Sequence, residues 1–246
     1  MTAPQTPPSC WESRGARCSR GLSWVVEGPE WLGRLGGRGP PQQGMAPRED
    51  SLHSFHCRKP EVMVHEVAAR KAGVTLIRRF TGGGTVVVDS DTLFTGLIMG
   101  VDEVPGLEPF PRPIMKWTED LFKPVFGKYG DFALREHDYV FKDVKFGGNA
   151  QAISKRRFVH HTSLLWRFDP DRMALLQHPA RTPEYRQGRP HHRFITPLQD
   201  HVPSRPHLLD QLTASLGSAG FALQEASLVE AEEALARNKI CGTRVL

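Results

Sequence analysis

Three consecutive glycines follow an arginine pair between two short apolar runs, in the segment RRFTGGGTVVVD that starts at Arg78 and ends at Asp89. The pattern predicts a strand, a tight loop and a second strand. Because glycine has no Cβ, a ligand can approach the main chain of such a loop closely, and Arg78 and Arg79 can supply positive charge beside it. The segment indicates either a site for an anionic or carboxylate-bearing ligand or a glycine-rich hairpin whose arginines point into water.

A second segment, DYVFKDVKFGGNAQAISKRRFVHHTSLLW, repeats the arrangement between Asp138 and Trp166. A single lysine, Lys145, lies two residues before the glycine pair Gly147 and Gly148, between runs typical of strands. The repeated pattern favours the ligand-binding interpretation, with both glycine-rich loops facing one pocket.

The two neighbouring histidines of this segment cannot have the same role. In a strand, side chains alternate between faces, so His160 and Thr162 share one face while His161 and Ser163 share the other. Only one histidine is therefore a site candidate, and the other is expected to be a hydrogen-bonded histidine of the strand.

The elements that must position these residues can be assigned from residue 60 onward. An amphipathic helix is predicted over 60–73, with proline at its start and glycine at its end, followed by a strand at 74–80. Strands are predicted at 85–89 and 93–100, and a helix over 115–129 that Pro124 should kink or split. Further strands are predicted at 132–141, 145–154 and 157–168, and helices at 169–177, 206–219 and 228–238. Strands grouped together with helices outside them predict an α+β fold.

The first fifty residues are rich in glycine and proline and show no sustained helical or strand period. We expect residues 1–55 to form a disordered or atypical extension and residues 56–246 to form the catalytic domain. Arg14, Arg17 and Arg20 are compatible with an organelle-targeting leader, whereas Glu12, Glu27, Glu30 and the many prolines around them are not.

Composition narrows the choice of partners and compartment. The chain has 246 residues, 39% of them hydrophobic and 24% charged, and a formal net charge of +5. This charge favours an acidic protein partner and is too small and dispersed to indicate nucleic-acid binding, and no apolar run is long enough for a membrane span. Four cysteines without CxxC spacing indicate a reducing intracellular compartment, either the cytoplasm or a mitochondrion or plastid, and no structural zinc.

The order RRFTGGGTVVVD, KFGGNAQ and HHTSLLW resembles the biotin/lipoate A/B protein ligase family, in particular the lipoate-protein ligase A type, over residues 58–198. The resemblance implies a mixed, largely antiparallel sheet flanked by helices, as in class II aminoacyl-tRNA synthetases and biotin ligases. Members normally begin with a helix and a strand that cover one side of the acyl pocket, and no counterpart is recognisable before residue 58.

The resemblance also implies a reaction. Lipoate or octanoate is activated by ATP to an acyl-AMP, and a lysine of a lipoyl carrier domain then captures the acyl group. Such domains occur in the E2 component of 2-oxoacid dehydrogenases and in the glycine cleavage H protein. Magnesium would be held by the phosphates and water rather than by protein ligands, and no tightly bound cofactor is implied.

Lys145 matches the family's single lysine, and we expect it to neutralise charge on the reacting carboxylate as the catalytic residue. His161, rather than His160, matches the position expected to face the ligand. The expected substrate- and adenylate-binding residues are Arg78, Arg79, Gly82, Gly83, Gly84, Asp138, Gly147, Gly148, Asn149 and His161.

Departures from the family pattern leave three alternatives open. Val88 and Asp89 stand where the family has His-Asp, Thr162 replaces a glycine, and residues 228–246 are too few for the accessory domain of bacterial ligases. An ATP-independent lipoyl or octanoyl transferase, a degenerate binder of lipoyl domains or nucleotides, and a need for a separate accessory protein are compatible with these changes. Phe158 occupies the position of the octanoyltransferase cysteine, which argues against a covalent thioester.

Overall fold

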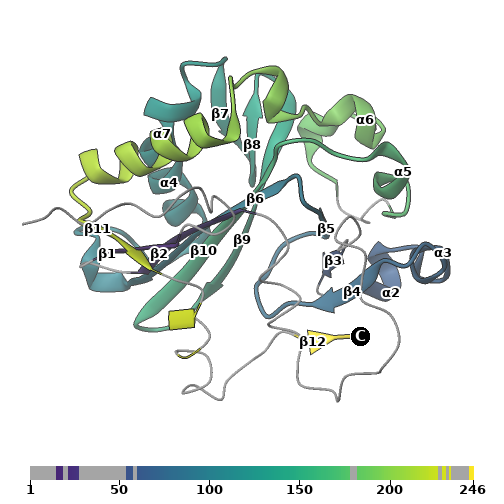
Figure 1. Cartoon of the computed structure of the whole chain (residues 1–246), viewed down its shortest axis with the longest axis horizontal. Coiled ribbons are helices and arrows are strands. Elements are labelled where there is room, and N and C mark those ends of the chain that lie inside the picture. The colour runs from purple at the N-terminus through teal and green to yellow at the C-terminus, as the bar shows by residue number, and fades with distance from the viewer. Residues whose placement is uncertain are drawn as a thin grey trace, which may run out of the picture.

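The computed structural model describes residues 60–177 and 182–226, with shorter pieces at 15–18, 22–27, 54–57, 229–230, 233 and 244–246. Its largest element is a six-stranded sheet whose neighbouring strands are all antiparallel (Figure 1). The strands, in spatial order, are β2 (Leu22–Glu27), β6 (Thr92–Gly100), β10 (Arg157–Leu165), β9 (Val144–Ile153), β8 (Asp138–Phe141) and β7 (Phe132–Arg135).

Tight turns create the antiparallel order of β7, β8 and β9. We predicted one strand over 132–141, and this was wrong because Glu136 takes a left-handed conformation with φ 53° and begins a hairpin turn. Lys142 does the same with φ 56° before β9, which places Asp143 in a turn. Positive φ at the first turn residue matches the twist of adjacent antiparallel strands.

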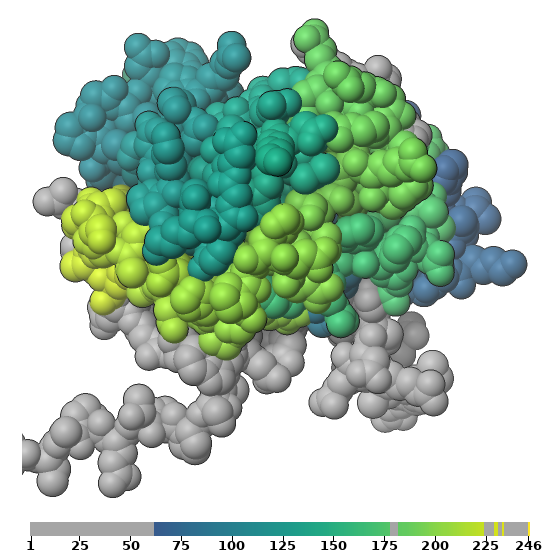
Figure 2. Space-filling model, turned by 90° about the horizontal axis from the view of Figure 1, so that it is seen from above, coloured from purple at the N-terminus to yellow at the C-terminus, as the bar shows by residue number. Residues whose placement is uncertain are grey.

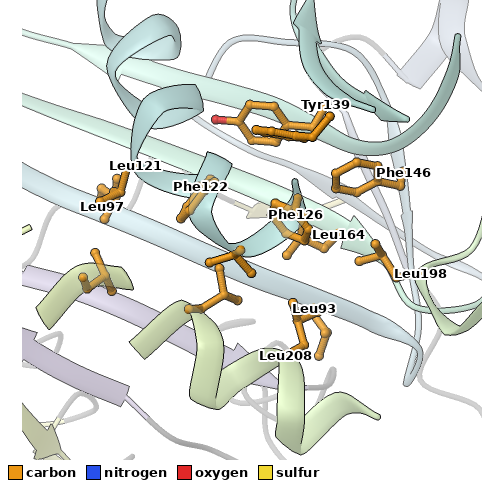
Figure 3. Packing of buried hydrophobic residues seen from close by; sticks show 14 of the residues in the cluster. Leu93, Leu97, Leu121, Phe122, Phe126, Tyr139, Phe146, Leu164, Leu198 and Leu208 are labelled. Atoms are coloured by element: carbon orange, nitrogen blue, oxygen red, sulfur yellow. The ribbon is translucent and has the colours of Figure 1, made fainter. Parts of the chain in front are cut away.

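Two helices cover one face of this sheet, α4 (Pro111–Phe126) and α7 (Arg205–Ser218) (Figure 1). Between helices and sheet lies the main core, which includes Phe122, Phe126 and Tyr139 and is shown in Figure 3. Helix α4 begins four residues earlier than predicted and continues through Pro124, which lies in its last turn. A proline there removes one of the last hydrogen bonds of the helix and does not split it.

A smaller sheet lies beside the large one and combines β12 (Arg244–Val245), β4 (Thr75–Arg78), β3 (Ser54–Cys57) and β5 (Val86–Val88), in that order. Strands β3 and β4 are parallel, so the fold is α+β with mixed but largely antiparallel sheets, as expected. In the space-filling view from above, the blue residues that follow position 60 are seen mainly at the right edge, next to green residues (Figure 2).

Short helices pack on the smaller sheet and enclose a second core that includes Leu76, Val87 and Phe194. They are α2 (Pro60–Met63), α3 (Glu66–Lys71), α5 (Pro170–Met173) and α6 (His191–Phe194). The single helices predicted over 60–73 and 169–177 were wrong in extent. Val64, 1% exposed, pairs with Leu176 as a β-bridge, and this pairing interrupts both helical segments.

The remaining elements include strands in the N-terminal segment. Three short 3-10 turns are η1 (Val101–Glu103), η2 (Glu184–Arg186) and η3 (Leu198–Asp200). We expected no strand before residue 50, and this was wrong: β1 (Gly15–Cys18) pairs with β11 (Leu223–Ala226), and β2 pairs with β6. The predicted helix over 228–238 lies mostly outside the described residues, and the domain boundary at residue 55 stays a prediction.

The triple-glycine loop between β4 and β5 of the smaller sheet is hydrogen-bonded to the large sheet. The Gly82 N–H donates to the Gln151 carbonyl of β9 over 2.8 Å, so the loop after β4 attaches to the large sheet. Gly83 has φ +125°, and a Cβ there would come within 3.1 Å of the Asn149 carbonyl oxygen and 2.9 Å of Arg79 Nη2. Only glycine fits this close approach of two backbones.

The core face of β10 carries a buried polar network. His160, 1% exposed, lies 2.9 Å through Nδ1 from Gln151 Nε2 and 3.4 Å through Nε2 from the Thr118 hydroxyl. Tyr139 donates its own hydroxyl to Thr118 over 2.6 Å. Burial lowers the pKa of His160 to about 3, with a further lowering by the neighbouring His161. The expectation that His160 is a hydrogen-bonded strand histidine is confirmed.

Within the described part of the chain, no helix combines the length and apolar composition that crossing a bilayer requires.

Replacing Gly83 by alanine is expected to lower the free energy of unfolding by about 1–3 kcal/mol, because the backbone would be held in a strained conformation. Gly84→Ala is the matched control, since a Cβ at Gly84 meets no atom within 4 Å. Urea unfolding of both variants measures the difference, and equal losses in the two would contradict the close approach at Gly83.

Acidification is expected to destabilise the fold through His160. Below its ordinary pKa of 6.5 the unfolded histidine binds a proton, whereas the folded one stays neutral until about pH 3, so stability falls as the pH falls between these values. His160→Gln should reduce the slope of unfolding free energy against pH by up to about 1.4 kcal/mol per pH unit. Urea unfolding at pH 4.5, 5.5 and 6.5 measures it; an unchanged slope would contradict the assignment.

Candidate functional site

A cavity of about 760 Å³ lies between the two sheets. One wall is apolar and comes from the smaller sheet and its helices, and it includes Met63, Val87, Met173 and Phe194. The opposite wall is polar and comes from β8, β9 and β10. Both glycine-rich segments line the cavity, which confirms the expectation that they face one pocket.

Lys145 and Asp138 form an ion pair on the polar wall. Lys145 Nζ lies 2.7 Å from Asp138 Oδ1, and the two side chains are 26% and 10% exposed. The Tyr185 hydroxyl donates to the other carboxylate oxygen, Oδ2, over 2.8 Å. Burial raises the pKa of Tyr185, and the adjacent Asp138 charge raises it further, so this phenol stays protonated and acts as a donor. Asp138 is thereby held by partners on both oxygens.

A β-bulge at Phe146 determines which way Lys145 points. The register between β8 and β9 shifts, because Tyr139 pairs with Gly147 while Val140 pairs with Lys145, leaving Phe146 as the extra residue. Without it, Lys145 and Gly148, three positions apart, would face opposite sides of the sheet. The bulge puts both on the cavity side and leaves Phe146 buried in the main core.

The glycine pair of β9 is divided between the two faces. A Cβ on Gly148 would lie 3.1 Å from Lys145 Nζ, so the lysine side chain passes over this glycine on its way to Asp138. A Cβ on Gly147 would meet Leu164, Thr162 and Tyr139, and Gly147 does not line the cavity. Its glycine identity therefore serves core packing.

Asn149 and Arg79 hold the polar wall in place while lining the cavity. Asn149 accepts from the Thr162 hydroxyl over 2.6 Å and donates to the His137 carbonyl over 3.1 Å. Arg79 is 6% exposed and donates from Nη2 to the carbonyl of Gly84. This hydrogen bond links the start of the glycine loop to its end.

Strand alternation explains the position of His161, one of the remaining expected site residues. His161 lines the cavity, on the opposite face of β10 from His160, and packs edge-on against Phe94 with ring centroids 6.1 Å apart. Burial lowers the pKa of His161 to about 4, with a smaller contribution from the charge of Arg79, so its imidazole is neutral at neutral pH. Arg78 is half-buried in β4 and is not a cavity-lining residue.

The cavity also contains residues that sequence reasoning missed, chiefly Gln151, Ser163 and Arg186. Arg186 is 3% exposed and belongs to the segment PEYRQGRP, which directly precedes α6. A signal for it exists, because two arginines flank a glycine in a loop bounded by prolines, but its burial follows only from the tertiary structure.

The arrangement suits a ligand with a charged head and an apolar tail. Cations and main-chain groups gather at the polar wall, while the other wall offers methionine and aliphatic side chains to a hydrocarbon. Among the described residues, no group of three or more histidines, cysteines and acids is placed to hold a metal ion.

Comparison with known proteins agrees with this geometry. A curated relative, described as inactive lipoate–protein ligase 2 of Plasmodium falciparum, is 30% identical over 51% of this chain. The chain spans about 41% of the length of that relative.

Solved structures share the fold. The bipartite lipoate protein ligase of Thermoplasma acidophilum, studied with its E2 lipoyl domain, superposes with a TM-score of 0.61 at 21% identity, over 75% of this chain and 74% of that one. A lipoate-protein ligase A bound with ATP gives a TM-score of 0.60 at 20% identity, over 75% and 76% of the two chains.

The family model for the lipoyl protein ligase A/B catalytic domain matches residues 56–217. This match covers both glycine-rich segments and the whole polar wall of the cavity, and the chain belongs to that family.

Proposed function

We propose that this protein binds lipoate or octanoate in the cavity between its sheets, activates it with ATP to an acyl-AMP, and transfers the acyl group to a lysine of a lipoyl carrier domain. The observation that carries the proposal is the position of Lys145. Its ammonium group lies on the polar wall, in front of the apolar wall, where the carboxylate of a bound fatty acid would meet it.

The chemistry requires neutralisation of negative charge in two steps. In the first, a carboxylate oxygen attacks the α-phosphorus of ATP and pyrophosphate leaves. In the second, the lysine amine of the carrier attacks the acyl carbon, AMP leaves with the bonding electrons, and the nitrogen loses a proton. Lys145 can stabilise the charge that develops on the oxygens in both steps.

The remaining polar groups position this lysine. Asp138 and Tyr185 orient the ammonium group, and the absence of a side chain on Gly148 leaves the path open. Neutral His161 can donate or accept a hydrogen bond without adding charge. Magnesium would enter with the phosphates of ATP and keep oxygen ligands from them and from water.

A lipoyl carrier domain is the proposed protein partner. Support comes from the Thermoplasma ligase of similar fold, which was studied with an E2 lipoyl domain. The positive net charge of this chain would favour association with an acidic domain.

A second candidate is a protein that binds the acyl group or its adenylate without activating it. The curated relative that is described as inactive favours this alternative. An intermediate version would accept acyl-AMP as donor and perform only the transfer step, without a nucleophilic cysteine.

One experiment separates these candidates. The protein is mixed with an apo lipoyl domain and octanoate or lipoate, with and without ATP and magnesium, and in parallel with preformed octanoyl-AMP. Intact-mass spectrometry then reads the carrier. Acylation that requires ATP is the expected result; acylation only from octanoyl-AMP indicates a transferase, and an unmodified carrier in every mixture would exclude both enzymatic functions.

Lys145→Ala is expected to reduce carrier acylation by about 100-fold or more, because an electrostatic group aimed at developing charge is lost. Lys155→Ala is the matched control, since Lys155 is exposed in the turn after β9 and outside the cavity. Initial rates from the same mass assay compare the variants. Equal rates for wild type and Lys145→Ala would remove the lysine from the mechanism.

A further inference from the structure

Arg186 is a buried cation that the reaction described above leaves without a role. It is 3% exposed and lines the cavity. Its Nε donates to the carbonyl of Arg189 over 2.8 Å, and its guanidinium carbon lies 4.9 Å from the centre of the Phe194 ring. Among the residues that the structure describes, Nη2 has no hydrogen-bond partner.

The loop that carries Arg186 is anchored on both sides. The Glu184 N–H donates to the Glu136 carboxylate over 2.7 Å, and the Tyr185 hydroxyl donates to Asp138. On the far side, Arg189 donates to the Asp143 carboxylate over 2.9 Å and to the Asp143 carbonyl over 2.8 Å. These contacts hold the backbone around Arg186 in place.

Among the described residues, Nη2 of Arg186 has no hydrogen-bond partner, whereas the neighbouring Asp138 carboxylate has two. Asp138, the nearby acid, accepts from Lys145 at Oδ1 and from Tyr185 at Oδ2, so each of its oxygens already has a partner. Burial lowers the pKa of Arg186, which reflects the cost of keeping a guanidinium out of water. A buried donor on a cation is unfavourable unless an acceptor reaches it, and an anionic acceptor compensates best.

We propose that Arg186 is a ligand-binding residue that receives anionic oxygens in this cavity through Nη2. The inference rests on the proposed function, in which two ligands carry such oxygens: the carboxylate of the fatty acid and the α-phosphate of ATP or acyl-AMP. In the described structure the charge of Lys145 is paired with that of Asp138. Arg186 supplies a second positive charge, and its Nη2 is available to either ligand.

The test compares each charged ligand with a neutral analogue. Isothermal titration calorimetry measures AMP and adenosine, and octanoate and octanamide, against wild type, Arg186→Gln and Arg186→Lys. If Arg186 binds phosphate, Arg186→Gln reduces the preference for AMP over adenosine by about 10- to 100-fold. If it binds carboxylate, the preference for octanoate over octanamide falls instead. Arg186→Lys should recover part of the loss, since it keeps the charge without the planar fork.

A merely structural role has a different signature. If Arg186 only supports the loop, Arg186→Gln weakens each charged ligand and its neutral analogue equally and leaves both preferences unchanged, which would overturn the proposal. Arg193→Gln is the matched control, because it removes the same charge from an exposed position on α6. An equal change in that variant would also overturn the proposal.

The outcome is separable from that of the proposed function. A wild-type protein that binds octanoate but neither AMP nor adenosine, and that does not acylate the carrier with ATP, would contradict activation by ATP. In that case, loss of the octanoate preference in Arg186→Gln would support Arg186 as the carboxylate ligand, and its retention would overturn the inference.

Discussion

The cavity depends on main-chain hydrogen bonds to the large sheet from the loop after β4 and from the segment after α6. The Gly82 N–H reaches the Gln151 carbonyl over 2.8 Å, and the Thr196 N–H reaches the Lys145 carbonyl over 2.8 Å. Each sheet has its own apolar core, and these bonds hold the cores at a separation that leaves room for a ligand. Backbone contact at this distance explains why the loop contains glycine, since Gly83 has φ +125° and a Cβ there would lie only 3.1 Å from the Asn149 carbonyl oxygen.

Charged and polar groups inside the cavity hold one another in place. Lys145, Asp138 and Tyr185 form a connected set, and Arg186 lies in the adjacent loop with one nitrogen directed at no described partner. Such groups cost desolvation free energy in the folded protein, and main-core packing around Phe126 and Tyr139 supplies the stability that tolerates them. Fixed groups in a water-poor site need no reorganisation when charge develops on a substrate, which is the advantage of placing them there.

Local geometry assigns opposite roles to residues that are adjacent in sequence. His160 enters the core network while His161 faces the cavity, and Gly147 packs against the core while Gly148 lies beneath Lys145. Strand alternation predicts the histidine pair. It also predicts opposite faces for the two glycines, but not that Lys145 shares a face with Gly148, because the bulge at Phe146 changes the phase of the strand.

The sequence by itself determined the kinds of group available and the elements that carry them: two glycine-rich segments, one lysine before the second, a histidine pair of which one member faces the cavity, and strands with a two-residue period. Local periodicity and backbone freedom encode these features, so they can be predicted without a structure. Only the tertiary structure decided that β2 joins the large sheet, that Val64 interrupts the first helix, that Lys145 meets Asp138, and that Arg186 is buried. Each of these depends on contacts between segments far apart in the chain, where packing and desolvation outweigh local preference.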